Sequence, residues 1–140
     1  MLRKARPEDI EPVRELIMNN LEKLLPRTSE ELRELIDTMW VVEDSGRIVG
    51  CCCLEIYSPK IAELRSLAVA ENFRHHGYGE LLVNEAVAEA RRHNIRQVLV
   101  VTSTPEFFEG LNFGACLDEK YALFWMGKDG TPQNADSAQR

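Results

Sequence analysis

Residues 67–82 have the sequence LAVAENFRHHGYGELL, which runs from the end of a strand through a loop into an amphipathic helix. Apolar residues recur at helical spacing over residues 78–90, and we expect this helix to end near Asn94. The first turn of a helix has several backbone N–H groups without an intrahelical partner, and Gly77 and Gly79 let a ligand approach them closely. The segment therefore predicts a binding site for phosphate oxygens.

The loop at residues 74–79, RHHGYG, has the pattern R-x-x-G-x-G. It is not a P-loop, because no Gly-Lys-Ser or Gly-Lys-Thr follows, and it lacks the first glycine of the dinucleotide-binding pattern G-x-G-x-x-G. Arg74 can add a charged guanidinium to the backbone donors. His75 and His76 have no third metal ligand at a suitable spacing, so we expect either ring to lie near a bound anion. Tyr78 is expected to pack as the first residue of the apolar helix stripe.

Composition and charge narrow the classes of function. The chain has 140 residues, of which 44% are hydrophobic, and this fits one domain with one core. Its formal net charge of −6 repels polyanions, so nucleic-acid binding is disfavoured and an anionic ligand must be held by local donors. No apolar run reaches the roughly 18–20 residues of a membrane span, and the N-terminal residues lack a secretory pattern. We expect a cytoplasmic protein without membrane contact.

The cysteines do not form a metal-binding pattern. Three are consecutive, Cys51, Cys52 and Cys53, and Cys116 is distant, so the paired C-x-x-C spacing of zinc sites is missing. Neighbouring residues of a strand point to opposite faces, so the three cannot converge on one ion. We expect small buried apolar residues in a reducing compartment and no metal site.

The remaining elements follow from hydrophobic periodicity, caps and turn residues. We expect strands at residues 2–5, 40–43, 48–56, 61–69 and 98–101, helices at 7–24, from 29, at 78–94 and 105–111, and a final strand pair between 116 and 126. Thr28-Ser29-Glu30-Glu31 is a capping box. The apolar run at 98–101 is typical of a strand covered on both faces and parallel to its neighbour. The chain is thus predicted to be a mixed α+β domain.

The strand at residues 61–69 is expected to alternate between the two faces of the sheet. Strict alternation places Glu63, Arg65, Leu67 and Val69 on one face and Leu64, Ser66 and Ala68 on the other.

These motifs resemble the GNAT superfamily of acyl-CoA-dependent N-acyltransferases, through Leu67-Ala68-Val69, the loop at 74–79 and the order of elements. The resemblance covers residues 1–127, and residues 128–140 are expected to be a disordered tail. It implies one GNAT domain with a central, mostly antiparallel sheet, a splayed parallel strand pair and about four flanking helices. It also implies acetyl-CoA as cosubstrate, with the pantetheine arm along the backbone of Leu67, Ala68 and Val69 and the pyrophosphate on amides from His75 to Gly79.

A narrower resemblance is to short bacterial N-acetylglutamate synthases and related amino-acid acetyltransferases. It rests on residues 24–32, LLPRTSEEL, residues 62–69, AELRSLAV, and residues 101–109, VTSTPEFFE. It implies that Arg27 contributes to the site, the alternative being a solvated surface arginine. Gly110 and Asn112 replace the arginine and glycine of the usual F-F-E-R-x-G-F, and a glycine inside a short helix costs about 1 kcal/mol, which indicates an altered acceptor pocket.

The chemistry requires an amine that loses its proton before it attacks a thioester. Glu63, near the splay of the strands, is the candidate general base, acting through a water molecule; the alternative is a structural ion pair with Arg65. Arg65 and Arg27 are candidates for a clamp on the carboxylate of a small substrate such as glutamate.

The tyrosine that protonates the leaving thiolate in many GNAT enzymes is replaced by Phe108. Water or a hydroxyl of Thr102, Ser103 or Thr104 is then the proton source, unless these hydroxyls only cap a strand or helix. Thr102 and Ser103 are also candidate substrate contacts. No nucleophilic triad is evident, so direct transfer to the amine is expected.

Two alternatives to a small amino-acid acetyltransferase stay open. One is an acetyltransferase for another small amine or a protein N-terminus, and the other is a non-catalytic acyl-CoA-binding module. A homodimer through apolar residues near Tyr121–Trp125 is expected by resemblance only.

Overall fold

The computed structural model describes residues 1–114 together with Leu123 and Trp125. Five strands form one sheet in the order β1-β2-β3-β4-β5, and only the β4–β5 pair is parallel. The strands are β1 (Leu2–Lys4), β2 (Met39–Asp44), β3 (Arg47–Ser58), β4 (Ile61–Val69) and β5 (Gln97–Leu99). The helices are α1 (Ile10–Met18), α2 (Ser29–Glu34), α3 (Tyr78–Arg92) and α4 (Pro105–Glu109), with 3-10 turns at Pro7–Asp9, Ile36–Thr38 and Glu71–Phe73. The predicted α+β class is confirmed, and so is the predicted order of the elements as far as α4.

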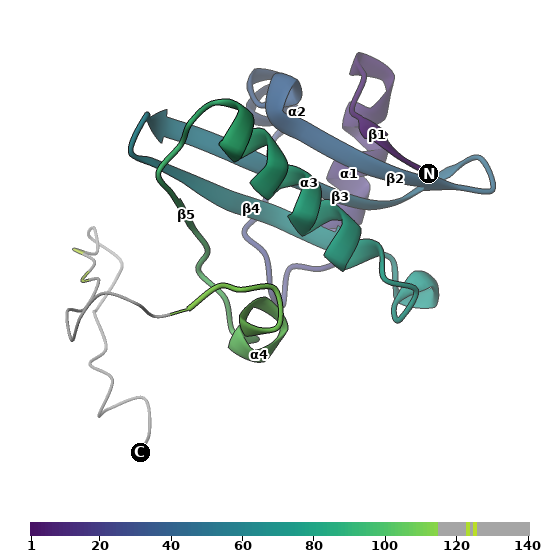
Figure 1. Cartoon of the computed structure of the whole chain (residues 1–140). Coiled ribbons are helices and arrows are strands. Elements are labelled where there is room, and N and C mark those ends of the chain that lie inside the picture. Colours follow the sequence, from purple (N-terminus) through teal and green to yellow (C-terminus); the bar gives the residue numbers. More distant parts are fainter. Residues whose placement is uncertain (115–122, 124, 126–140) are drawn as a thin grey trace.

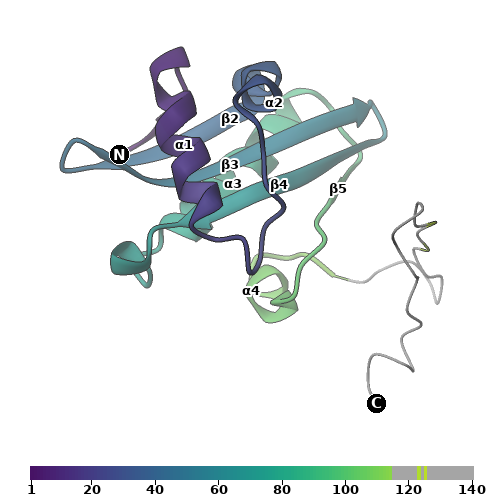
Figure 2. The ribbon, with the colours of Figure 1, turned by 180° about the vertical axis from the view of Figure 1, so that it is seen from behind.

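The sheet is covered on both faces, as Figures 1 and 2 show from opposite sides. Helix α3 lies across one face, over a core that includes Trp40, Leu54 and Leu82. Helices α1 and α2 lie on the other face, over a second core that includes Ile17 and Leu32. Burial on both sides explains why the middle of β3 is an uninterrupted apolar run rather than an alternating one.

The three consecutive cysteines of β3 divide between these two cores, as predicted. Cys52 packs on the α3 side, and Cys51 and Cys53 pack on the α1 side. Burial raises the pKa of all three thiols, that of Cys53 to about 12. They are therefore neutral, inert packing groups at neutral pH.

Strict alternation along β4 is wrong, because the strand contains a bulge at Ser66. Cys51 pairs with Ala68 and Cys53 with Arg65, so two residues of β4 oppose Cys52. Ser66 has a φ of 56°, in the left-handed region. The extra residue reverses the faces: Leu67 packs with the α3 core, on the face opposite to that of Glu63 and Arg65.

The parallel pair is shorter than the sequence predicts. Strand β5 pairs with β4 only through Ile61–Gln97, Ala62–Val98 and Glu63–Leu99. The chain then leaves the sheet, and Val101 is 64% exposed, so the prediction of a strand covered on both faces through Val101 is wrong. Among the described residues, the edge of β4 beyond Glu63 has no neighbouring strand on the β5 side.

The end of helix α1 differs from the prediction. Helix α1 ends at Met18 rather than near Leu24, because Asn20 turns its side-chain amide back onto the carbonyl of Leu16, and Leu21 is exposed. The capping box at Thr28 is confirmed, with reciprocal bonds to Glu31.

Helix α4 ends at Glu109, so Gly110 is its C-cap residue and does not carry the cost of a glycine within a helix. Asn112, two residues on, has a φ of 69°, which asparagine tolerates better than most residues. The change from the family pattern therefore leaves this turn intact.

The expected final strand pair and the tail at 128–140 lie outside the described residues. Leu123 and Trp125, which are described, are 88% and 90% exposed. Within residues 1–114, no helix combines the length and apolarity needed to cross a membrane.

Candidate active site

A pocket of about 530 Å³ lies between the end of β4 and the start of α3. Leu67, Ala68 and Val69 form one wall, and the loop and first turn of α3 form another. The other lining residues are Asn20, Lys23, Leu24, Phe73, Arg74, His75, Gly77, Tyr78, Gly79, Glu80, Thr104 and Phe107. All residues proposed from the sequence to hold the cofactor line it except His76.

The start of α3 presents free backbone donors to this pocket. Gly77 is the N-cap residue, with a φ of 80° that only glycine adopts without strain. Its carbonyl accepts the first helical bond, from Leu81 at 3.1 Å. The amides of Tyr78, Gly79 and Glu80 have no hydrogen-bond acceptor within the described part of the chain. A helix of 15 residues adds the positive end of its dipole, so the turn favours an anion.

Two side-chain cations stand at the same pocket. Arg74 donates from Nη2 to Asn20 at 2.9 Å and from Nε to the carbonyl of Val69 at 3.4 Å. Lys23, in the turn that follows α1, also lines the pocket. The net charge of the protein is negative, so these local groups provide the attraction for a polyanionic ligand.

Tyr78 connects the first turn of α3 to the β2–β3 hairpin. Its hydroxyl donates to Asp44, which lowers the pKa of that carboxyl and raises the pKa of the phenol. The ring also packs against the core, as predicted. His76 stacks edge-on between Phe73 and Tyr78 and does not reach the pocket. Tyr78 and His76 thus stabilise the loop through their contacts with Asp44 and Phe73, and Tyr78 also lines the pocket.

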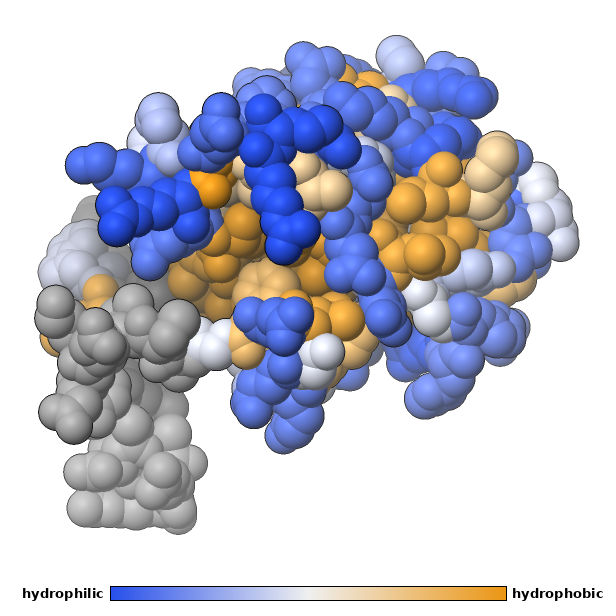
Figure 3. All heavy atoms as spheres, viewed as in Figure 1, coloured by the Kyte–Doolittle hydropathy of each residue, from blue (hydrophilic) through white to orange (hydrophobic). Residues whose placement is uncertain are grey.

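The two phenylalanines of α4 have different environments. Phe108 is buried in the α3 core, so the position of the missing family tyrosine is apolar and closed. Phe107 is 39% exposed and lines the pocket, where a Cβ on Gly79 would lie 3.4 Å from its ring. Figure 3 shows polar side chains along the outer face of α3 and apolar surface next to them, on the side toward β5 and α4. Gly79 and Phe107 therefore form an apolar wall of the pocket next to the free amides at the start of α3, which we call the anion cradle.

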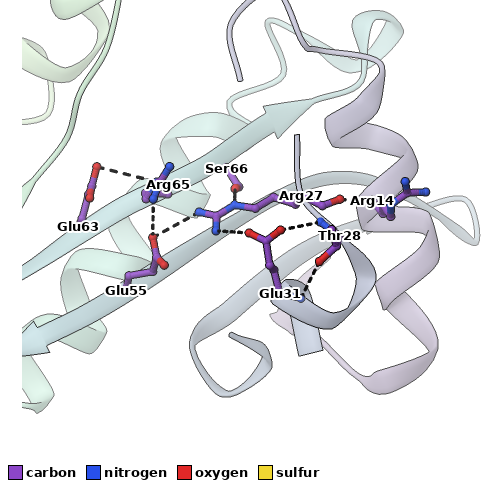
Figure 4. Close-up of polar contacts among 8 residues, drawn as sticks. All are labelled: Arg14, Arg27, Thr28, Glu31, Glu55, Glu63, Arg65 and Ser66. Atoms are coloured by element: carbon purple, nitrogen blue, oxygen red, sulfur yellow. Dashed lines mark hydrogen bonds and ion pairs between the residues drawn. The ribbon is translucent and has the colours of Figure 1, made fainter. Parts of the chain in front are cut away.

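Arg27 is buried on the α1–α2 side of the sheet, which overturns the alternative of a solvated surface arginine (Figure 4). Its Nε donates to the Ser66 hydroxyl at 3.3 Å, and its other nitrogens face Glu31 at 3.5 Å and Glu55 at 3.3 Å. Its carbonyl accepts from Arg14 at 3.2 Å. The side chain is held in one orientation by groups from several elements of the fold.

Arg65 joins this group from β4. Its Nη1 lies 3.2 Å from the Glu55 carboxylate, and its Nε lies 3.9 Å from Glu63. Burial opposes the charge of Arg65, but Glu55 and Glu63 outweigh it and raise the pKa of the guanidinium. Glu63 also accepts from Tyr57 at 2.7 Å, and partial burial together with this bond raises the pKa of Tyr57 to about 12. We call Arg27, Glu31, Glu55, Glu63 and Arg65 the charged cluster.

The charged cluster lies beside the pocket along β4, and none of its five residues is among those that line the pocket. Ser66, which holds Arg27, immediately precedes Leu67 of the pocket wall. Glu63 is the last position at which β4 pairs with β5. The cluster therefore lies where the two strands separate, on the face opposite to α3.

Thr102 and Ser103 are not among the residues that line the pocket, whereas Thr104 is. The Thr102 hydroxyl accepts from the Thr104 amide at 2.9 Å, just before α4. This local bond indicates a structural role for Thr102 in the turn before α4, whose N-cap residue, Thr104, has no side-chain capping bond.

Sequence reasoning missed Asn20, Lys23 and Glu55. Asn20 and Lys23 follow a helix whose end was placed too late. Glu55 directly follows the buried run of β3, and no local pattern marks it as a partner of Arg27. Within the described residues, no group of three or more His, Cys, Asp or Glu side chains is placed to hold a metal ion.

A mixed sheet with one short parallel pair, and a helix start that faces the open end of that pair, defines an α+β acetyltransferase domain. The sequence model of the acetyltransferase (GNAT) family matches residues 9–113. The chain belongs to this family.

Proteins similar in sequence to this chain bear the names of acetyltransferases. An uncharacterized N-acetyltransferase of Chlorobaculum tepidum is 38% identical over 90 residues, which are 64% of this chain and 58% of that protein. An amino-acid acetyltransferase of Mycobacterium tuberculosis is 30% identical over 112 residues, which are 77% of this chain and 64% of that protein. The chain thus spans less than two thirds of the length of either relative.

Solved structures agree with the fold. A Mycobacterium tuberculosis protein in complex with CoA and NLQ superposes with a TM-score of 0.78 at 26% identity, covering 99% of this chain and 79% of its own. N-acetylglutamate synthase from Neisseria gonorrhoeae, complexed with coenzyme A and N-acetyl-glutamate, superposes with a TM-score of 0.73 at 28% identity. The match covers 79% of this chain and 27% of the synthase chain.

Proposed function

We propose that this chain transfers an acetyl group from acetyl-CoA to the amine of a small amino acid. The observation that carries the proposal is the set of unpaired amides at Tyr78, Gly79 and Glu80, facing a pocket with Arg74 and Lys23. The names of two similar proteins, an amino-acid acetyltransferase and an N-acetylglutamate synthase, support glutamate and related amino acids as acceptors. The proposed domain spans residues 1–127.

The pocket fits the cofactor in both of its chemical parts. Backbone donors, a helix dipole and two cations suit a diphosphate. The free edge of β4 at Leu67–Val69, with Phe107 opposite, suits the amide-bearing and apolar pantetheine arm. Acetyl-CoA supplies the acetyl group as a thioester, and the residues of this chain bind and orient it.

The acceptor is proposed to bind at the charged cluster. Arg27 and Arg65 would hold its carboxylate, because two fixed guanidiniums match a carboxylate better than flexible lysines do. Glu63 would accept the proton of the ammonium group, directly or through water, which leaves a neutral amine able to attack. The ion pair with Arg65 and the hydrogen bond from Tyr57 would orient the Glu63 carboxylate.

The leaving thiolate needs a proton, and Phe108 cannot provide one. Thr104 is the hydroxyl that lines the pocket, and water is the alternative donor. We propose that the thiolate takes its proton from one of these two, without an acyl-enzyme.

The test is calorimetric titration of the purified protein with CoA and acetyl-CoA, followed by thiol release from acetyl-CoA with a panel of amino acids. We expect binding of both, and thiol release that depends on the amino acid. Absence of binding would overturn the proposal. Binding without thiol release for any amino acid of the panel would instead support a different amine acceptor or the non-catalytic acyl-CoA-binding module.

A further inference from the structure

One oxygen of Glu55 occupies the position between the two arginines. Oε2 accepts from Arg27 at 3.3 Å and from Arg65 at 3.2 Å, as Figure 4 shows. The Glu55 side chain is 18% exposed, and that of Arg27 is 8% exposed. The protein's own carboxylate therefore sits where the carboxylate of an acceptor would be clamped.

The charge balance of the cluster is negative. Arg27 and Arg65 face three carboxylates, those of Glu31, Glu55 and Glu63. An acceptor with one carboxylate must share or displace one contact of Glu55. An acceptor with two carboxylates adds a further negative charge to a cluster in which carboxylates already outnumber guanidiniums. The repulsion between these carboxylates is strong because the cluster is partly buried.

The fold holds Glu55 in this place. It stands on β3 directly opposite Glu63 on β4, where two like charges repel unless a cation compensates them. Arg65 lies within ion-pair distance of both carboxylates. Because Glu55 belongs to a strand and not to a loop, it can leave the arginines only by a side-chain rotation.

We infer that Glu55 is a specificity-determining residue, which directs the acceptor site toward amino acids with a neutral side chain and against dicarboxylic ones. This inference rests on the proposed function, since it concerns the acceptor of the same site. Its physical basis is competition between Glu55 and the acceptor's carboxylates for Arg27 and Arg65.

The experiment compares glutamine with glutamate, which have nearly the same shape and differ by one charge. The ratio of their kcat/KM values is measured in the wild type and in Glu55→Gln. The substitution keeps the size of the side chain and an acceptor oxygen, but removes the charge. We expect the wild type to prefer glutamine, and Glu55→Gln to shift the ratio toward glutamate by about tenfold or more.

Glu85→Gln is the matched control. Glu85 pairs with Arg92 at 2.9 Å on α3 and is likewise partly exposed, at 31%. The substitution changes the net charge by the same amount away from the pocket. We expect it to leave the ratio within about twofold of the wild type, so that a shift specific to Glu55→Gln reflects its position.

A ratio that Glu55→Gln leaves unchanged would overturn the inference, and so would a wild type that prefers glutamate. Failure of the proposed function is separate, because it appears as absent CoA binding or as absent thiol release with every amino acid. In that case, titration of each protein with glutamine and glutamate still decides the inference: tighter glutamate binding by Glu55→Gln supports it, and unchanged affinity overturns it.

Discussion

Arg74 donates a hydrogen bond of 2.9 Å to the side-chain oxygen of Asn20, so the loop before α3 is tied to the turn that follows α1. Asn20 is buried, and its amide nitrogen donates to the Leu16 carbonyl at 2.8 Å. A fixed side chain therefore orients the exposed guanidinium at the mouth of the pocket.

Asn20→Ala is expected to weaken CoA binding about three- to tenfold, because Arg74 loses the partner that orients it. Titration calorimetry measures the affinity, and thermal unfolding checks that the variant is folded. Asn20 acts through Arg74, so the same substitution in an Arg74→Ala background should have little further effect. An equal loss in both backgrounds would contradict this.

Gly77→Ala is expected to lower stability by about 1–2 kcal/mol, since its φ of 80° is unfavourable for alanine, and to weaken CoA binding as well. Gly46→Ala is the control, because Gly46 has a φ of 76° in the β2–β3 hairpin and, like Gly77, would place an added Cβ in open space. Both variants should lose similar stability in urea unfolding. Only Gly77→Ala should lose affinity for CoA. Equal CoA affinities of the two variants would argue against anion binding at the start of α3.

Arg27→Ala and Arg65→Ala are each expected to raise the KM for the amino acid by about tenfold or more, because a charged hydrogen-bonding partner of the carboxylate is lost. Arg27→Lys should recover only part of the loss, since one ammonium cannot reach Ser66, Glu31 and Glu55 together. Steady-state kinetics at saturating acetyl-CoA provide the values. An unchanged KM in both alanine variants would exclude the clamp.

The contribution of Asp9 to the stability of the protein is expected to decrease at acid pH. Two hydrogen bonds from Arg3, at 2.7 and 3.1 Å, lower the pKa of the buried Asp9 carboxyl, although burial opposes this. A carboxyl with a lowered folded pKa stabilises the protein above its unfolded pKa of about 4, and this contribution is lost as the pH falls through the folded pKa.

Asp9→Asn should therefore cost about 2–3 kcal/mol at neutral pH, as expected for a partly buried ion pair that is lost, and progressively less as the pH falls below the unfolded pKa of about 4. Urea unfolding at several pH values measures this. Asp37→Asn, at an exposed position, should show no such trend. A cost for Asp9→Asn that is constant with pH would contradict the assignment.

The thiols of Cys51, Cys52 and Cys53 should be unreactive in the folded protein, because they are buried and their pKa values are raised. A Cys116→Ser variant isolates them. We expect a thiol reagent to modify none of them quickly under native conditions and all three after unfolding in guanidinium chloride. Fast native modification would show that this part of the core opens readily.

Features that depend on neighbouring residues were predictable. The capping box at Thr28 and the bounds of β4 agree with the sequence, because caps and hydrophobic period act within a few positions. The end of α1 was not predictable, since apolar spacing continues to Leu24 while a side-chain contact of Asn20 stops the helix.

The bulge at Ser66 shows the limit of a two-residue period. Its hydroxyl accepts from Arg27 and its carbonyl accepts from the Cys51 thiol, so contacts from distant segments surround the left-handed residue. Alternation holds within residues 61–65 and within residues 67–69, but the bulge reverses the faces between the two segments, and a two-residue period cannot place it.

By itself, the sequence determined the order of the elements as far as α4 and the glycine-containing helix start at residues 77–80, because the glycines, the helix start and the preceding strand lie next to one another in the chain. Only the tertiary structure decided that Glu55 lies between Arg27 and Arg65, which are 28 and 10 positions away from it. Strand pairing and the packing of the α1–α2 connection bring these three together, and neither is encoded in a local pattern.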